Sequence, residues 1–528
     1  MLNKLENLII ETARSKPDSI SLIYRNNQLD YGELAGSIEQ VARGLIHIGL
    51  AKQERVAIYL PKRFETVQSF FGTSLAGGVF VPLNPLLKAE QVSYILCDCN
   101  VRILVTTKDR VSLLSQVLTD CHDLQHIIVI DANDTEGLDN TSKTLLTWDD
   151  FIQNSSPISL HRTIDTDIAS ILYTSGSTGK PKGVVLSHLN MVTGAESVAQ
   201  YLKNSSTDRL LAVLPFSFDY GFSQLSTAFH KGASVMLMDY LLPRDVINAV
   251  AKNAITGLAA VPPLWIQLAK LEWPEAAKKS LRYITNSGGA MPVSTLKALR
   301  SALSKTDVYL MYGLTEAFRS TYLDPVHLDS RPESMGKAIP NAEILVVRED
   351  GTPCAPGEPG ELVHRGPLVA MGYWGDKEKT AERFRPAPGQ DKNSPSQEIA
   401  VWSGDTVRMD EEGFLYFISR KDEMIKTSGY RVSPTEIEEV VYRTGHVGEV
   451  VALGIPHPSL GQGIILMATP PQTGQLEKDM ILAECKKQLP SYMVPADIIE
   501  KSSLPRNPNG KIDRKALSQE VQGLFQEE

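Results

Sequence analysis

The chain has 528 residues, of which 42% are hydrophobic and 22% are charged. This length exceeds one ordinary domain of roughly 100 to 200 residues, and the composition excludes intrinsic disorder as the main state. The 53 Lys and Arg residues against 62 Asp and Glu residues give a net charge of −9. That balance argues against a general nucleic-acid binder, because such proteins carry a basic excess.

The N-terminal segment and the cysteines indicate where the chain acts. Residues 1–19 place Lys4, Glu6 and Glu11 among apolar side chains, which predicts an amphipathic surface helix and no signal peptide. No later apolar run reaches the roughly 18 residues of a membrane span. The five cysteines are scattered and form no zinc-type pair of pairs. We therefore expect a cytoplasmic chain without a transmembrane segment or a structural metal.

Strand-like and helix-like patterns alternate over the first four hundred residues. Residues 56–60 and 79–83 are apolar runs typical of buried strands, and the pattern between them at 64–77 is helical. Such alternation predicts βαβ units and largely parallel sheets, so the fold class is α/β. After about residue 335, short strands are broken by Asp-Gly and Pro-Gly turns, which favours an antiparallel or barrel-like subdomain.

A charged turn at residues 420–422 follows the strand-like run 413–419. We place a hinge there, with an N-terminal domain at 1–420 and a smaller C-terminal domain at 421–528. The chain shows no internal repeat and no low-complexity tract.

The segment 172–188, LYTSGSTGKPKGVVLSH, has the composition of a phosphate-binding loop. Glycines let backbone amides converge, hydroxyl groups add donors and lysines add positive charge, which suits phosphate oxygens. It is no Walker A loop, because Gly176 and Gly179 are separated by two residues and Pro181 follows Lys180. The candidate phosphate contacts are Thr174, Ser175, Gly176, Ser177, Thr178, Gly179 and Lys182; a plain surface turn is the alternative.

This segment closely resembles the signature loop of the adenylate-forming superfamily, which comprises acyl-CoA synthetases, amino-acid adenylation domains and luciferases. Motifs similar to those of the superfamily follow in the same order at 286–292, 311–316, 402–408 and 505–513. The resemblance spans the whole chain. It implies a large N-terminal domain of two helix-flanked sheets with a β-barrel-like subdomain, and a small mobile α+β C-terminal domain that carries a catalytic lysine.

The resemblance also implies roles for individual residues around ATP and Mg²⁺. Tyr312 would stack on adenine, Thr315 would contact the α-phosphate, and Glu316 would help to hold magnesium. Lys511 would reach the reacting carboxylate and phosphate. The remaining nucleotide contacts would be Gly288, Gly289, Ala290, Met311, Gly313, Asp405 and Arg420, of which Asp405 and Arg420 lie at the ribose.

These residue types suit the chemistry of acid activation. When a carboxylate oxygen attacks the α-phosphate of ATP, both reactants and the leaving pyrophosphate are negative, so their charge must be offset. Magnesium at Glu316 and the Lys511 ammonium would do this. The resemblance then implies rotation about Asp422, with Ser428 and Gly429 lining a channel for the thiol of CoA or of carrier-protein phosphopantetheine.

The candidate acid pocket departs from the fatty-acid and aryl-acid pattern. Phe218 stands where those enzymes usually carry His, and Phe218-Asp219 resembles the motif of amino-acid adenylation domains, whose Asp pairs with the substrate ammonium. Arg319 matches a pocket position too. Either Asp219 and Arg319 pair with each other, or they bind an ammonium and an acidic group of the substrate. The other candidate pocket residues are Tyr220, Ser223, Ala260, Ser287, Met311 and Ser320; this polarity disfavours long-chain fatty acids.

One departure concerns recognition of the adenine base. Leu310 and Met311 precede the stacking Tyr312, where many relatives have Asn, Gln or Gly, so backbone carbonyls near Gly288 would have to bind the adenine amino group. Segments 81–96 and 422–440 look like the AMP-forming acyl-CoA ligases associated with the bacterial exosortase A system, whose genomic neighbours often include a stand-alone acyl carrier protein.

We therefore expect ATP-dependent activation of an amino acid or similarly polar acid, followed by thioester formation. Three alternatives stay open: an acyl-CoA ligase for a small non-amino acid, a luciferase-like oxidase, for which the sequence offers no oxygen-handling site, and a non-catalytic ATP-binding scaffold.

Overall fold

The computed structural model describes residues 3–135, 138, 143–153, 159–174, 181–391, 393–420, 425–427, 430–457, 460–472, 474–489, 491–507 and 510–525. Several predicted site residues lie outside these ranges: Ser175, Gly176, Ser177, Thr178, Gly179, Asp422, Ser428 and Gly429, together with the side chain of Arg420. Among the described residues, no helix combines the length and the apolar character needed to cross a membrane.

The first sheet of the N-terminal part has the strand order β19-β9-β8-β4-β3-β5-β6-β7. Strands β4, β3, β5, β6 and β7 pair in parallel, as the βαβ pattern predicts. Its strands are β3 (Arg55–Ile58), β4 (Val79–Pro82), β5 (Val101–Thr107), β6 (His126–Ile130), β7 (Thr144–Thr147), β8 (Ile168–Thr174), β9 (Lys182–Ser187) and β19 (Gly372–Tyr373). The helices of this segment are α3 (Phe64–Leu75), α4 (Ala89–Asp98), α5 (Lys108–Leu114) and α6 (Trp148–Gln153), with a short 3-10 helix at Leu118–Asp120.

The second sheet has the order β16-β15-β14-β13-β12-β10-β11-β1-β2. Its strands are β1 (Ile20–Tyr24), β2 (Asn27–Asp30), β10 (Arg209–Ala212), β11 (Ser234–Leu237), β12 (Gly257–Ala260), β13 (Tyr283–Asn286), β14 (Asp307–Tyr312), β15 (Thr321–Leu323) and β16 (Lys337–Ala338). The accompanying helices are α1 (Asn7–Ser15), α2 (Tyr31–His47), α7 (His188–Tyr201), α8 (Asp219–His230), α9 (Pro243–Lys252), α10 (Pro262–Leu268), α11 (Glu275–Ser280) and α12 (Val293–Ala302), with 3-10 helices at Thr315–Ala317 and Pro325–His327.

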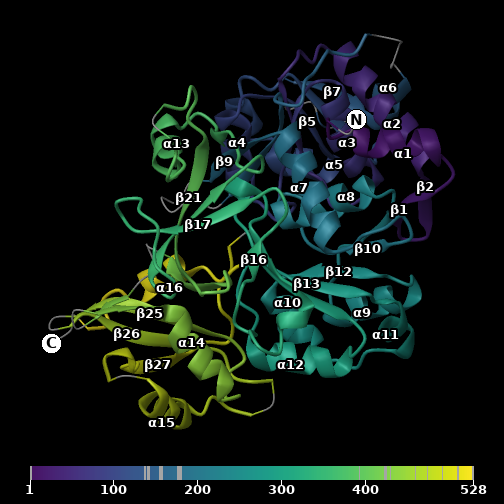
Figure 1. The fold of residues 1–528 in the computed structure, drawn as a ribbon. Helices are drawn as coiled ribbons and strands as arrows, with labels where there is room; N and C mark the ends of the chain where they lie inside the picture. Colours follow the sequence, from purple (N-terminus) through teal and green to yellow (C-terminus); the bar gives the residue numbers. More distant parts are fainter. Residues whose placement is uncertain are drawn as a thin grey trace.

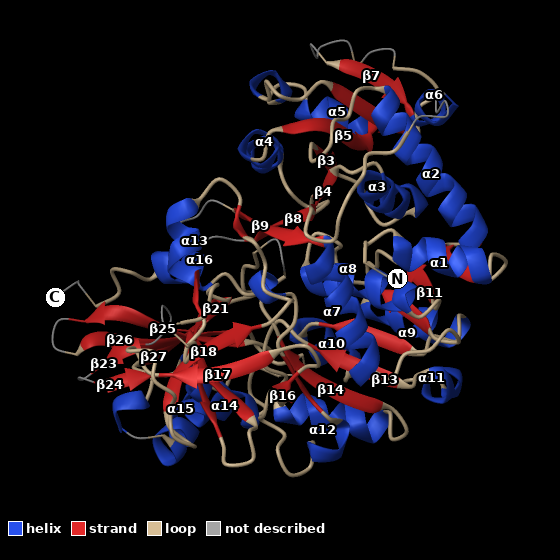
Figure 2. Cartoon of the chain, turned by 45° about the horizontal axis from the view of Figure 1, so that its top comes forward, coloured by secondary structure: helices blue, strands red, loops and turns tan. Residues whose placement is uncertain are grey.

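The main hydrophobic core lies between these two sheets. Helices α7 and α8 occupy the space between them (Figure 2), and one continuous cluster of buried side chains joins both sheets. Phe222 of α8 stacks on Phe71 of α3 and on Phe80 of β4, with ring centroids 6.1 and 5.3 Å apart. Such aromatic contacts fix the start of α8 relative to the sheet ends.

An antiparallel subdomain follows, as the Gly- and Pro-broken pattern predicts. Its order is β17-β18-β21-β20, with β22 paired to β21. The elements are β17 (Glu343–Val347), β18 (Pro359–Arg365), α13 (Lys377–Arg383), β20 (Phe384–Pro386), β21 (Ile399–Met409) and β22 (Leu415–Arg420).

The C-terminal part forms its own sheet and its own core (Figure 1). The order is β24-β23-β26-β25, and β27 pairs in parallel with β26. The elements are β23 (Ile425–Thr427), β24 (Tyr430–Val432), α14 (Pro434–Arg443), β25 (Val450–His457), β26 (Gly461–Ala468), α15 (Lys478–Gln488), β27 (Asp497–Glu500) and α16 (Arg514–Glu520), with a 3-10 helix at Ser491–Met493. The expected boundary falls between β22 and β23, and a hinge there stays a prediction.

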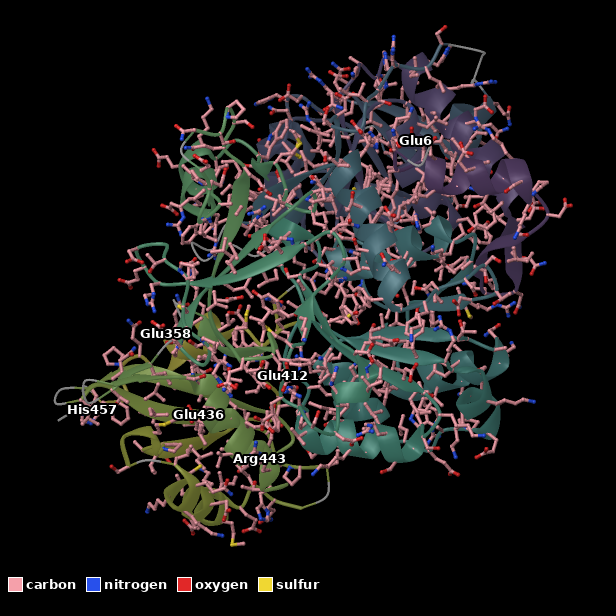
Figure 3. The ribbon with its side chains drawn as sticks, in the orientation of Figure 1. Glu6, Glu358, Glu412, Glu436, Arg443 and His457 are labelled. Atoms are coloured by element: carbon pink, nitrogen blue, oxygen red, sulfur yellow. The ribbon has the colours of Figure 1, made fainter. Side chains whose placement is uncertain are left out.

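Polar contacts hold the C-terminal part against the rest. Arg443, at the end of α14 (Figure 3), places its Nη2 2.5 Å from Glu333 Oε1. The hydroxyl of Ser433 donates to the carbonyl of Ile418, and α14 also contacts α12. Since both members of the Arg443–Glu333 pair are about half exposed, this contact stabilises the arrangement only weakly.

Candidate active site

Predicted site residues gather where three neighbouring parallel strands end. β12, β13 and β14 run parallel, with Ala260 opposite Asn286 and Asn286 opposite Leu310. Ligands in α/β proteins bind at the carboxyl ends of such strands. Ala260, Ser287 and Met311 therefore come to one edge of the sheet, and α8 begins beside it at Asp219.

Asp219 is tied into a buried polar network. Its residue is 3% exposed; its Oδ1 accepts a hydrogen bond of 3.0 Å from Thr315 Oγ1, and its Oδ2 lies 3.1 Å from Arg319 Nη1. Burial raises the pKa of the Asp219 carboxyl, and the Arg319 guanidinium and the Thr315 hydroxyl offset part of that rise. Of the two interpretations that the sequence left open, the structure contains the Asp219–Arg319 ion pair.

Arg319 is held from two sides and still keeps unused donors. The residue is 1% exposed, and its guanidinium carbon lies 4.5 Å from the centroid of the Tyr220 ring. The Tyr220 hydroxyl is in turn 2.5 Å from Thr285 Oγ1. Arg319 Nε and Nη2 have no hydrogen-bond partner within the described part of the chain.

Lys511 comes from the C-terminal part to this same edge. A Cβ atom built on Gly288 would lie 3.8 Å from Lys511 Cε and 3.7 Å from Phe218 Cζ, and Gly288 has a φ of +82° that disfavours other residues. Asn507 fixes the loop, because its N–H donates to the Lys511 carbonyl at 2.8 Å and its Oδ1 accepts from the Lys511 N–H at 3.0 Å. The Lys511 ammonium also acts to lower the pKa of Asp219.

The candidate magnesium carboxylate, Glu316, is positioned by a residue that the sequence did not single out. The Tyr373 hydroxyl donates to Glu316 Oε1 at 2.6 Å, and Lys182 Nζ lies 5.3 Å from the centroid of the Tyr373 ring. Burial is the largest influence on the Lys182 ammonium and lowers its pKa. Thr174 and Lys182 are register partners on β8 and β9, so the two described ends of the predicted phosphate loop lie side by side.

A single carboxylate fits the expected metal. Mg²⁺ is usually held by one or two carboxylates together with substrate phosphates and water. Among the described residues, no group of three or more His, Cys, Asp or Glu side chains is arranged to hold a metal, so Glu316 would share the ion with ATP phosphates.

The predicted adenine and ribose residues also lie together. The Tyr312 hydroxyl donates to Asp405 Oδ2, and Asp405 is the register partner of Arg420 across β21 and β22. A Cβ on Gly313 would lie 3.4 Å from Arg319 Nη1, so a predicted nucleotide contact lies beside a predicted pocket residue. Gly289 and Ala290, the other predicted nucleotide contacts of this group, are exposed.

Other predicted pocket residues are engaged elsewhere. The Ser320 hydroxyl is 2.9 Å from His364 Nδ1, and burial lowers the pKa of His364 to about 3. The Met311 sulfur accepts a hydrogen bond from the Tyr201 hydroxyl at 3.0 Å. Ser223 lies buried within α8, 3.4 Å from the Thr227 hydroxyl.

Comparisons with known proteins identify the family of the chain. The chain matches the family model of the AMP-binding enzyme over residues 9–374, and that of the AMP-binding enzyme C-terminal domain over residues 436–511. The long-chain-fatty-acid–CoA ligase of Escherichia coli O157:H7 is 30% identical over 509 residues, which cover 90% of this chain and 87% of that protein.

The chain is also similar to a second relative and to a solved structure. A linear gramicidin synthase from Brevibacillus parabrevis is 30% identical over 507 residues, which are 95% of this chain and only 6% of that protein. The ATP-bound structure of MatB from Rhodopseudomonas palustris superimposes with a TM-score of 0.86 over 99% of this chain and 100% of that chain, at 23% identity, and so shares the fold. The chain therefore belongs to the AMP-binding enzyme family and is an AMP-forming ligase.

Proposed function

We propose that this ligase uses ATP and Mg²⁺ to convert a small polar carboxylic acid into an acyl-adenylate. A carboxylate oxygen would attack the α-phosphorus, and pyrophosphate would leave. One observation carries the proposal: Lys511 of the C-terminal part lies beside Gly288 and acts to lower the pKa of Asp219. Thr315, which donates to Asp219, and the adjacent Glu316 lie at the same edge of the sheet.

Each of these side chains has a defined task in the proposal. The Lys511 ammonium would offset charge that develops between carboxylate and phosphate. The Thr315 hydroxyl donates to Asp219 Oδ1 in the structure and would turn its O–H towards the α-phosphate when ATP binds. Mg²⁺ at Glu316 would neutralise charge on the phosphates. Tyr312 would stack on adenine, and Asp405 and Arg420 would bind the ribose.

Pyrophosphate exchange tests this first step. Purified enzyme should incorporate labelled pyrophosphate into ATP only when a suitable acid is present, and hydroxylamine should trap the activated acid as a hydroxamate. If no acid in a broad panel of amino acids, hydroxy acids, dicarboxylates, aryl acids and fatty acids gives either signal, the proposed first step is wrong.

For the second step we propose transfer of the acyl group to a thiol. The sulfur would attack the acyl carbon and AMP would leave. Relatives named as CoA ligases support CoA as the acceptor, and the resemblance to the exosortase A subgroup supports a stand-alone carrier protein. In this proposal residues 421–528 turn about Asp422, and Ser428 and Gly429 line the thiol channel. Mass spectrometry of reactions with either acceptor distinguishes the two.

Two classes of acid remain candidates in this proposal. An amino acid is supported by Asp219 at the position that resembles the adenylation-domain motif. A small acid without an ammonium group is supported by the Asp219–Arg319 pair, since the carboxylate already has a cationic partner. Matched acids that differ only in one substituent separate the two classes.

A further inference from the structure

The buried Asp219–Arg319 pair is neutral overall, but some of its hydrogen-bond donors have no acceptor in the described part of the chain. One carboxylate and one guanidinium cancel in net charge. Yet a guanidinium has five N–H donors, and Arg319 Nε and Nη2 find no acceptor among the described residues although the residue is 1% exposed. Buried donors of this kind are almost always satisfied in folded proteins, because leaving them without a partner is costly.

Several acceptors of this region are engaged by other groups, and the buried Asn286 Oδ1 receives no hydrogen bond from Arg319. Trp265 Nε1 donates to the carbonyls of Ala260 and Thr285 at 2.9 and 3.1 Å. The Thr285 hydroxyl is engaged by Tyr220, and the Ser320 hydroxyl by His364. Because Arg319 Nε and Nη2 find no partner among the described residues, their acceptor comes from outside that part of the chain.

We propose that the acid substrate itself brings this acceptor. An oxygen atom of the substrate, in a hydroxyl, an oxo group or a second carboxylate, receives hydrogen bonds from Arg319 Nε and Nη2. This inference rests on the function proposed above and names its substrate class as short, oxygen-substituted carboxylic acids. A planar guanidinium suits such an oxygen better than a single-point cation does.

The hydrogen-bond chain limits the distance between the two ends of the acid. Thr315, which would contact the α-phosphate, is one hydrogen bond from Asp219, and Asp219 is one hydrogen bond from Arg319. The oxygen substituent therefore sits a few bonds from the reacting carboxyl carbon. A substrate ammonium at that place would meet the Arg319 cation, and Asp219 is already paired with that cation, so the proposal disfavours amino acids.

A purely structural role for Arg319 makes a different prediction. If the guanidinium only braces Asp219 against the Tyr220 ring, its substitution should lower stability without changing which acid is preferred. If Arg319 binds an oxygen atom of the substrate, substitution of Arg319 should change the preference among acids of equal length.

The experiment compares matched acids in pyrophosphate exchange and hydroxamate formation. Propionate, lactate, pyruvate, malonate, alanine and β-alanine form a three-carbon set, and butyrate, 4-hydroxybutyrate, succinate and 4-aminobutyrate form a four-carbon set. We expect kcat/KM for an oxygen-substituted acid to exceed that of the unsubstituted or amino-substituted acid by on the order of a hundredfold or more. A preference for amino acids would overturn the inference and leave the proposed function intact. A preference for unsubstituted acids would overturn the inference and the polarity of the proposed substrate, and would leave the adenylation step intact.

Variants identify the group that produces the preference. Because Arg319→Met alone would leave the Asp219 carboxylate buried without a cation, the informative variant is the double substitution Asp219→Asn/Arg319→Met, which should remove most of the preference. Asp208→Asn/Arg282→Met is the matched control. It removes another Asp–Arg pair, at 2.9 Å, whose residues directly precede β10 and β13 and so lie at the strand ends opposite the site. This variant should keep the wild-type preference.

A thermal melt checks that each variant is folded. If the double variant is unfolded, Arg319→Lys keeps the positive charge and loses the planar pair of donors, and the preference should still fall. Retention of the wild-type preference in a folded Asp219→Asn/Arg319→Met or Arg319→Lys variant would contradict the proposal. Absence of activity with every acid would instead refute the proposed function.

Discussion

At the scale of single residues, the candidate site depends on a few charged side chains that lie close together. Glu316 and Arg319 come from one stretch of the chain and Lys511 from another. Each meets a partner that the fold positions: Tyr373 for Glu316, Asp219 for Arg319 and Gly288 for Lys511. Predictions at this scale concern single functional groups.

Substitution of Lys511 should affect adenylation strongly. Removal of one charge that stabilises the transition state costs on the order of 3 kcal/mol, so Lys511→Ala should slow pyrophosphate exchange about a hundredfold or more. Lys515→Ala, an exposed lysine of the neighbouring helix α16, is the control and should stay near wild type. An exchange rate near wild type in Lys511→Ala would remove Lys511 from the proposed mechanism.

Tyr373 should act through Glu316. Tyr373→Phe removes only the hydroxyl that donates to Glu316 Oε1, so the carboxylate loses its fixed orientation. Groups that orient metal ligands contribute about 10-fold or more to metal affinity, and the Mg²⁺ concentration for half-maximal pyrophosphate exchange should rise accordingly. Tyr416→Phe removes a hydroxyl that donates to the Asp410 carboxylate instead and should leave the Mg²⁺ dependence unchanged. Equal Mg²⁺ curves for both variants would contradict this role.

At the scale of elements, the sequence predicted regular segments well. The apolar runs 56–60 and 79–83 correspond to β3 and β4, and the helical pattern between them corresponds to α3. These segments could be predicted because their apolar residues recur with the period of the element. The antiparallel character of the segment after residue 335 could likewise be predicted from its Gly and Pro turns.

Elements without a periodic pattern could not be predicted from the sequence. Strand β19 has two residues, and it brings Tyr373 to the site only through its pairing with β9. Two residues carry no periodicity, so nothing in the sequence singled out Tyr373. The Asp219–Arg319 pair joins residues one hundred positions apart, and its geometry depends on side-chain conformations that a sequence pattern does not encode.

The first turn of α8 leaves no room for a side chain at Gly221. A Cβ on Gly221 would lie 2.0 Å from the carbonyl oxygen of Pro215, so Gly221→Ala must displace the turn that carries Asp219. We expect a loss of about 1–3 kcal/mol of stability, together with a lower kcat/KM. The matched substitution Gly36→Ala in α2 meets nothing within 4 Å and should stabilise by about 0.5–1 kcal/mol. Denaturant unfolding measures both; equal effects would contradict the steric argument.

At the scale of the whole molecule, buried histidines couple stability to pH. Burial lowers the pKa of His364 to about 3 and also lowers the pKa of His188. In the unfolded chain both would titrate near pH 6.5, so below that pH the unfolded state binds more protons than the folded state. Stability is therefore fully present above about pH 6.5 and falls as the pH drops towards the folded pKa values.

Thermal unfolding between pH 7.5 and 4.5 checks this dependence. His364→Gln keeps a side chain of similar size without a titrating group, so its melting temperature should fall less steeply with decreasing pH than that of the wild type. A slope equal to the wild-type slope would show that His364 does not contribute.

The C-terminal part has a hydrophobic core of its own, separate from the core between the two large sheets. In the proposed rotation, the Lys511 cation would travel on a part of the chain that keeps its own core. The rotation would break weak contacts between the two parts, such as the half-exposed Arg443–Glu333 pair. The strength of these contacts would then set how often the cation is at the reaction centre, without changing how strongly it acts there.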